Sequence, residues 1–135
     1  MNPMPRAILA GALYWGLVFT WAFALGALRT MVVTPRYGEI PAVLAEMPLV
    51  LVASWFASRW TVRRLAVGHT PAERLVMGGT AFSLLIGAEI ALAAVMSGRS
   101  AGEWLAGLGT VPGAIGLGGQ LGFGFLPFIQ GAKQR

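Results

Sequence analysis

A run of 22 residues without a charged side chain, Ala7 to Leu28, restricts the fold of this chain more than any other feature. As an α-helix the run is about 33 Å long, at about 1.5 Å per residue, and the hydrocarbon core of a bilayer is about 30 Å thick. The run also exceeds the apolar core of about 7–15 residues that secretory signals contain. We therefore expect a permanent membrane-spanning helix, with lipid as its solvent.

Three further apolar stretches follow, and together the four predict an all-α integral membrane protein. We place the spans at about 7–28, 40–65, 71–96 and 112–130, which makes residues 1–135 a single transmembrane domain. The composition supports this, because 56% of the residues are hydrophobic and 11% are charged, whereas soluble domains carry about 25% charged residues. The last stretch contains six glycines and has the weakest hydropathy, so a re-entrant segment is an alternative to a full crossing.

Capping patterns indicate where the later helices begin. Thr70-Pro71-Ala72-Glu73 combines a capping hydroxyl, a proline suited to the first helical position and a capping-box glutamate. Gly68 can take the left-handed conformation that ends the preceding helix, which predicts a tight hairpin of spans two and three. Ser100-Ala101-Gly102-Glu103 is a second capping box, and Trp104 favours a short interfacial helix at 101–109. The expected fold is a four-helix bundle with this short helix before the last span.

Small residues recur every four positions in two of the spans. They are Gly79, Ser83 and Gly87 in span three and Ala114, Gly118 and Gly122 in span four. Such ridges let another helix approach closely, so we predict that both are helix-docking faces. Packing within the monomer and docking of a second chain are both open at this point.

Basic residues are divided unequally between the two sides of the expected membrane. The side with both termini carries seven: Arg6, Arg59, Arg63, Arg64, Arg74, Lys133 and Arg135. The other side carries three: Arg29, Arg36 and Arg99. Because basic loops stay in the cytoplasm, we expect both termini there. Contact of Arg59, Arg63, Arg64 and Arg74 with lipid headgroups explains the net charge of +5 without a nucleic-acid partner.

Two glutamates lie inside the predicted spans. Glu46 and Glu89 both fall in the outer part of the membrane, below its outer surface. The same end of the spans carries Arg29, Arg36 and Glu39, and these five residues form a predicted intramembrane charge cluster. A charge at the centre of a bilayer costs on the order of 3 kcal/mol by insertion scales, and an intramembrane carboxylate is by default a functional candidate. If Arg29 reaches either glutamate, the pair is structural. If no arginine reaches it, the glutamate can exchange a proton or bind a cation.

Other polar residues within the apolar stretches are few. Gln120 in span four requires a hydrogen-bond partner inside the protein. With no Cys, no Asp and a single His69 in a polar loop, neither a Ser-His-Asp nor a Cys-His site can be assembled. His69 also has no neighbours with metal-ligand spacing. We therefore expect no enzyme activity, no metal site and no cofactor.

One pattern covers the first connection and the second span: Arg29, Pro35-Arg36-Tyr37-Gly38-Glu39, Glu46-Met47-Pro48, Trp55, Arg59-Trp60 and Arg63-Arg64. This pattern resembles small four-span proteins of proteobacteria with no assigned activity, and the resemblance implies a location in the bacterial inner membrane. Small multidrug resistance proteins have a similar length, but they carry a glutamate in the first span, and here that span has no acid. The glycine- and asparagine-based signature of small fluoride channels is missing as well.

Two functions of different classes fit these features. The leading hypothesis is a non-catalytic accessory, assembly or stabilising subunit of a larger membrane complex, because short loops leave little soluble surface and the ridges offer docking faces. Its partners would be the lipid bilayer and other membrane subunits or a second copy. The alternative is a small oligomeric proton- or cation-coupled transporter or channel that uses Glu46 and Glu89. A cavity that reaches both carboxylates favours transport, whereas sealed carboxylates with Arg29 in reach favour the subunit.

Overall fold

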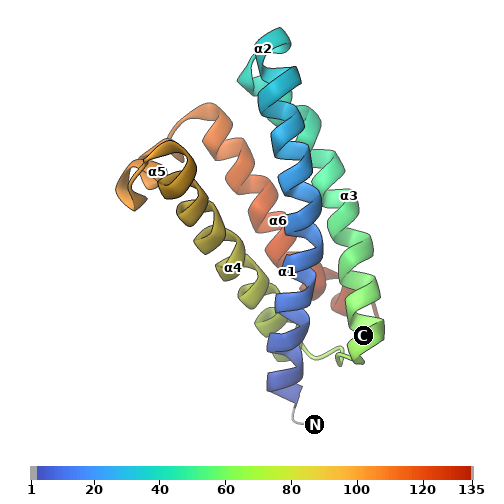
Figure 1. The fold of residues 1–135 in the computed structure, drawn as a ribbon. Coiled ribbons are helices and arrows are strands. Elements are labelled where there is room, and N and C mark those ends of the chain that lie inside the picture. The colour runs from blue at the N-terminus through green and yellow to red at the C-terminus, as the bar shows by residue number, and fades with distance from the viewer. Residues whose placement is uncertain (1–2, 135) are drawn as a thin grey trace.

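A computed structural model describes residues 3–134 and confirms the all-α fold class. Its elements in chain order are α1 (Pro3–Leu28), the π-helical segment η1 (Arg29–Val33), α2 (Thr34–Tyr37), α3 (Glu39–Leu65), α4 (Pro71–Ser97), α5 (Ala101–Gly107) and α6 (Val111–Gln134). The start of α1 and the end of α6 lie at one end of the bundle, which we call the terminal end (Figure 1). The opposite end, where α2 and α5 lie, is called the α2/α5 end.

The four long helices form a bundle in which each packs against two others. α1 packs against α3 and α4, and α6 packs against the same two helices. It follows that α1 faces α6 across one diagonal and α3 faces α4 across the other. The prediction of a tight hairpin of α3 and α4 is therefore wrong: the loop at 66–70 joins diagonal partners, with α6 packed against both.

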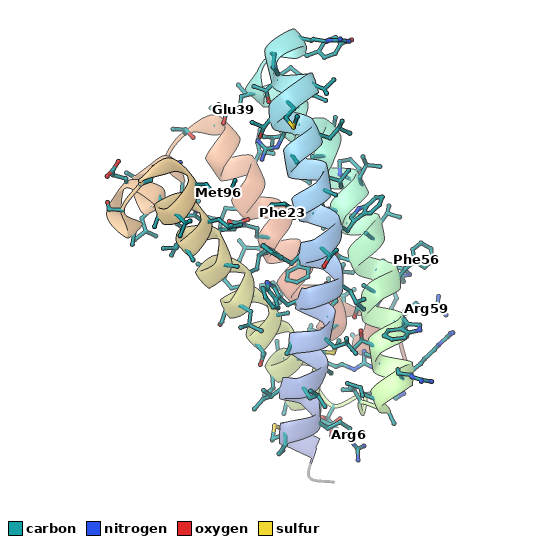
Figure 2. The ribbon with its side chains drawn as sticks, in the orientation of Figure 1. Arg6, Phe23, Glu39, Phe56, Arg59 and Met96 are labelled. Carbon is teal, nitrogen blue, oxygen red and sulfur yellow. The ribbon has the colours of Figure 1, made fainter. Side chains whose placement is uncertain are left out.

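Three stretches of the described residues are long and apolar enough to cross a bilayer: Met4–Tyr37, Glu39–Leu65 and Pro71–Met96. Their outer sides expose large apolar side chains such as Phe23 and Phe56, which are 49% and 64% exposed (Figure 2). This arrangement suits lipid rather than water as the surrounding medium. α6 has 24 residues, enough to span, but it is not among these three stretches. Its full crossing stays a prediction.

The connection between α1 and α3 is itself mostly helical. α1 continues through η1 into α2, and the chain reverses at Gly38, whose φ of +91° favours glycine. At the terminal end, Ala66 and not Gly68 takes the left-handed conformation that ends α3, with φ of +52°. The expectation for Gly68 is therefore wrong.

Both predicted helix starts are confirmed. The Thr70 hydroxyl accepts a hydrogen bond from the backbone N–H of Glu73 at the start of α4. Ser100 and Glu103 form a reciprocal capping box at the start of α5. These local signals succeed because a cap is satisfied by residues three apart in the sequence and depends little on the rest of the fold.

Glycines allow α4 to touch two neighbouring helices through the backbone. A Cβ on Gly11 of α1 would lie 2.5 Å from the carbonyl oxygen of Met77 in α4. A Cβ on Gly78 of α4 would collide with the carbonyl group of Gly124 in α6. No larger residue fits at either place without moving a helix, so these two glycines set how closely α1, α4 and α6 approach.

The ridges predicted as docking faces turn away from these contacts. Their exposed members are Gly79, Ser83 and Gly87 on α4 and Ala114 and Gly118 on α6. A Cβ on Gly79 or Gly87 would meet no atom within 4 Å. Gly122 is half-buried against Leu51 of α3. Packing within the monomer is therefore the wrong interpretation of the α4 ridge, and docking of a second chain there stays a prediction.

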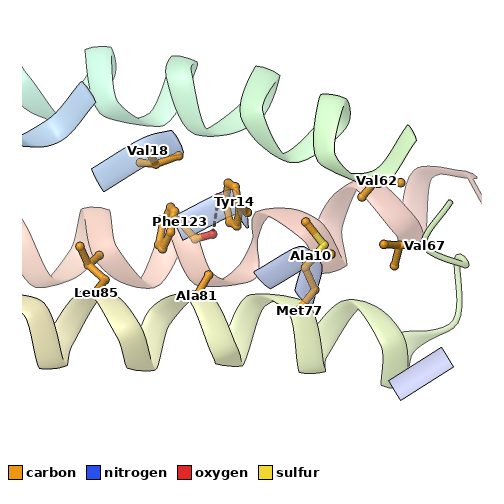
Figure 3. Close-up of a cluster of buried hydrophobic side chains, with 9 residues drawn as sticks. All are labelled: Ala10, Tyr14, Val18, Val62, Val67, Met77, Ala81, Leu85 and Phe123. Atoms are coloured by element: carbon orange, nitrogen blue, oxygen red, sulfur yellow. Dashed lines mark hydrogen bonds between the residues drawn. The ribbon is translucent and has the colours of Figure 1, made fainter. Parts of the chain in front are cut away.

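A hydroxyl from α1 completes the hydrogen bonding of α6. Pro127 lies inside α6 and has no N–H to donate to the carbonyl of Phe123, one turn earlier. The fully buried Tyr14 hydroxyl donates to that carbonyl oxygen at 2.7 Å, and its ring stacks on Phe123 with 4.4 Å between centroids (Figure 3). Lipid offers no replacement donor. Tyr14 therefore links α1 to its diagonal partner α6 through the centre of the bundle.

A buried arginine fastens the terminal end. Arg74 is 1% exposed; its Nε donates to the Gly68 carbonyl at 2.8 Å, its Nη1 donates to the Pro127 carbonyl at 3.0 Å, and its Nη2 lies 2.9 Å from His69 Nδ1. The prediction that Arg74 contacts lipid headgroups is therefore wrong, because the 66–70 loop and α6 enclose it. Contact with headgroups stays a prediction for the exposed Arg59, Arg63 and Arg64.

A polar contact also joins α6 to α3. The buried Gln130 accepts a hydrogen bond from the Ser58 hydroxyl at 2.6 Å and donates to the Trp55 carbonyl at 2.9 Å. Lys133 lies over the Trp55 ring, with its Nζ 5.1 Å from the centroid. Together with Arg74, these contacts place the last turns of α6 against both α3 and α4.

Replacing Tyr14 tests the contact through the centre of the bundle. Tyr14→Phe should lower the free energy of unfolding by about 1–2 kcal/mol, because it leaves a buried carbonyl without a donor. The melting temperature of the purified chain in mild detergent measures this loss. In a Pro127→Ala background the same substitution should cost less, since alanine restores the missing N–H. Equal costs in the two backgrounds would contradict the role assigned to Tyr14.

Replacing Arg74 tests the contact at the terminal end. Arg74→Met should lower the free energy of unfolding by about 2 kcal/mol, because it leaves the buried Pro127 carbonyl and the partly buried Gly68 carbonyl without this donor. The matched control is Arg63→Met, which changes an exposed arginine and should stay within about 0.5 kcal/mol. Thermal unfolding of both variants in the same detergent compares the two positions. Similar melting temperatures would show that Arg74 does not hold this end together.

Candidate functional site

The bundle opens toward the α2/α5 end into a cleft of about 660 Å³, which we call the polar cleft. Its charged and amide-bearing lining residues are Arg29, Glu39, Glu46, Glu89, Arg99 and Gln120. Its inner part is apolar and includes Val18, Leu85 and Phe123, which also belong to the buried core (Figure 3). The polar cleft therefore joins the charged residues of the α2/α5 end to the middle of the bundle.

An ion pair between α1 and α3 occupies one wall of the polar cleft. Arg29 Nε lies 2.5 Å from Glu46 Oε2, and the two side chains are 30% and 19% exposed. The Nε–H bond itself is not aligned for a hydrogen bond, so charge and proximity hold this contact. Arg29 begins the π-helical segment η1, and such segments are frequent at functional sites. Of the two alternatives that the sequence leaves open, the structure shows an arginine in reach for Glu46.

A second polar contact joins α4 to α6. Gln120 Nε2 donates a hydrogen bond to Glu89 Oε2 at 2.5 Å, which supplies the partner that the sequence requires for Gln120. The other amide atom, Gln120 Oε1, is buried and accepts no hydrogen bond from the described residues. Glu89 is therefore held by a neutral amide, whereas Glu46 is held by a cation. The two membrane glutamates differ in this respect.

The structure brings together four of the five residues predicted as a charge cluster. Arg29, Glu39, Glu46 and Glu89 all line the polar cleft, and Figure 2 shows Glu39 near the α2/α5 end. Arg36 does not line it and is exposed on α2, because the helix continues through η1 and carries this residue outward.

Two further residues of the polar cleft come from the segment between α4 and α6. Arg99 lines the cleft and donates from Nη2 to the Glu103 carbonyl at 3.1 Å. Trp104 of α5 lines it as well. Sequence reasoning missed both, since the capping box at Ser100 predicts that a helix begins there but not the direction in which that helix folds.

The charges that line the polar cleft favour the binding of a cation. Three carboxylates and two guanidinium groups line it, and one carboxylate is already paired with Arg29. A cleft with excess charge of one sign and low-dielectric walls concentrates ions of the opposite sign. Within the described chain, no group of three or more His, Cys, Asp or Glu side chains is arranged to hold a metal ion. None of these contacts tests the expectation that the protein has no enzyme activity and no cofactor.

Comparison with known proteins returns no relative: no protein-family model, no curated protein and no solved structure matches this chain. What the fold and helix lengths establish is a small helical protein with three candidate membrane spans.

A double-mutant cycle measures the ion pair in the polar cleft. Arg29→Met and Glu46→Leu should each destabilise the chain, because each leaves one charge without its partner, and the double variant should be more stable than either single variant. Since both side chains keep some exposure, we expect a coupling of about 1 kcal/mol rather than the larger values of fully buried pairs. Thermal unfolding in detergent measures all four proteins. Additive losses would show that the pair contributes nothing to the fold.

Proposed function

We propose that this protein is a small cation-coupled transporter and that Glu89 is the group that binds the cation. One observation carries the proposal: a cleft of about 660 Å³ that is lined by both membrane glutamates and lies toward one end of the bundle. Sealed carboxylates would instead favour a purely structural role.

The different partners of the two glutamates assign them different roles. Glu46 already has a cationic partner in Arg29, so a second cation gains less from binding there. Glu89 is hydrogen-bonded to a neutral amide, and its charge remains available to a cation that enters the polar cleft. Under this proposal Glu46 and Arg29 position α1 and α3, and Glu89 meets the transported or coupled ion.

Transport also requires that the closed end of the bundle opens. Beneath the polar cleft the bundle is filled by Tyr14 and Phe123, and at the terminal end by Arg74, all of them buried. Release of a cation toward the terminal end therefore requires α1 and α6 to separate at the Tyr14 hydrogen bond. The described structure corresponds in this scheme to a state open at the α2/α5 end.

The distribution of basic residues supports an orientation for this scheme. Arg59, Arg63 and Arg64 are exposed near the end of α3, close to the terminal end, and Figure 2 shows Arg6 and Arg59 toward that end. Because basic loops stay on the cytoplasmic side, we place the terminal end in the cytoplasm and the mouth of the polar cleft on the periplasmic side of a bacterial inner membrane.

An accessory subunit of a larger membrane complex is the second candidate function, and one observation favours it. Gly79, Ser83 and Gly87 form an exposed ridge on α4, and a Cβ on either glycine would meet no atom of the described residues within 4 Å. A ridge of this kind fits a helix of another subunit or of a second copy. Purification in mild detergent separates the two functions, because a stoichiometric larger complex supports the subunit and a homo-oligomer is compatible with transport.

Proteoliposomes test the transport proposal directly. The purified full chain should dissipate an imposed proton or cation gradient, followed with a fluorescent indicator, and Glu89→Gln should abolish this flux because it removes the charge that binds the ion. Glu103→Gln is the matched control, since it removes an equivalent charge outside the polar cleft and glutamine still completes a capping box. Flux that survives Glu89→Gln, or no flux in the unmodified chain, would overturn the proposal.

A further inference from the structure

We infer that the polar cleft recognises a protonated amine that carries N–H bonds and an apolar body, rather than a bare inorganic cation. This inference rests on the proposed function and names the substrate class of the same site. Three properties of the polar cleft carry it: the balance of charges, an unused hydrogen-bond acceptor and the size of the apolar inner part.

The balance of charges fits a single positive charge. Near the ion pair of Arg29 with Glu46 the cleft wall also contains Glu89, which has no ion-pair partner among the described residues. A ligand with one positive charge neutralises it. A divalent ion would require more oxygen ligands than this arrangement provides, in keeping with the absence of a metal-ligand group among the described residues.

The unused acceptor fits N–H donors. Gln120 gives its Nε2 to Glu89 and leaves Oε1 buried without a donor from the described residues, directly beside the carboxylate. A buried acceptor without a donor is unfavourable, and a donor on a ligand can recover that loss. A primary ammonium group bound at Glu89 has further N–H bonds to offer Gln120 Oε1 once the amide turns this atom toward the cleft, whereas a quaternary ammonium group has no N–H to donate.

The size and lining of the polar cleft fit an organic molecule. Its volume of about 660 Å³ lies within the range of about 300–1,000 Å³ that small-molecule sites occupy. Below the charged level its walls are apolar, with Val18, Leu85 and Phe123 at the inner end. Trp104 lines the polar cleft on α5, and an indole ring attracts cations through its π face. A proton or a single metal ion would leave this space unused.

Calorimetric titration of the full chain in mild detergent tests the inference with three probes of equal chain length. Hexylammonium should bind at least about tenfold more tightly than hexyltrimethylammonium, because it alone offers N–H bonds, and hexanoate should not bind because its charge is negative. Micelles without protein provide the blank for each probe. A large excess of sodium ions should leave hexylammonium binding within about twofold.

Two variants assign the binding to the proposed groups. Glu89→Gln should weaken hexylammonium at least about tenfold, whereas the control Glu103→Gln should leave it unchanged. Gln120→Leu should reduce the preference for hexylammonium over hexyltrimethylammonium at least about threefold, since the unused acceptor is gone. Melting temperatures of the variants confirm that each is folded.

The outcomes separate this inference from the proposed function. Equal binding of the two cationic probes, displacement by sodium, or tight binding that persists in Glu89→Gln would overturn the inference. Flux in proteoliposomes that depends on Glu89, together with no binding of hexylammonium, would leave the transport proposal standing and reject the amine. Selective amine binding without flux would reject transport and retain the amine as the ligand of the polar cleft.

Discussion

The hydrogen bond from Tyr14 to the Phe123 carbonyl is the contact on which the rest of the bundle depends. Pro127 leaves that carbonyl without its usual donor, and lipid cannot supply one. The bond joins diagonal helices, so it fixes the centre of the bundle rather than one edge. On its terminal side lie the buried Arg74 and Gln130, and on the other side the helices leave a cleft.

The requirement that polar groups find their partners inside the protein also explains the polar contacts on both sides of the Tyr14 hydrogen bond. At the terminal end, Arg74 gives its donors to carbonyl groups of α6 and of the 66–70 loop. At the α2/α5 end, Arg29 meets Glu46 and Gln120 meets Glu89, with space left beside them. The polar groups at the closed end are enclosed by protein, whereas those of the polar cleft can be reached by a ligand. This contrast is the basis of the transport proposal.

Sequence reasoning predicted the helices well and their arrangement poorly. Apolar length and capping patterns are local signals, and the observed bounds of α3, α4 and α5 lie close to the expected ones. Which helices are neighbours depends on contacts between distant residues. The diagonal placement of α3 and α4 follows from α6 packing against both of them, which no pattern in the 66–70 loop reveals. The small-residue pattern of α4 likewise does not say which glycine faces α6: Gly78, one position from the predicted ridge, makes that contact.

The residues of the candidate site were predictable from local signals, but most of their contacts were not. Intramembrane charges are rare, so Glu46, Glu89 and Arg29 stand out in the sequence, and the pairing of Arg29 with Glu46 could be anticipated. The contact of Gln120 with Glu89 could not, since the requirement for a partner does not say which residue provides it. Arg99 and Trp104 reach the polar cleft through the direction of α5, which its capping box does not determine.

The diagonal placement of α3 and α4 also bears on biogenesis. These helices leave the ribosome one after the other, joined by a short loop, yet in the finished protein they do not pack together. A nascent chain that ends before α6 lacks the acceptor of Arg74 at Pro127 and the partner of Ser58 at Gln130. α6 therefore completes the assembly after α3 and α4 have been made, and a chain that ends before α6 would leave the Ser58 hydroxyl without its Gln130 acceptor.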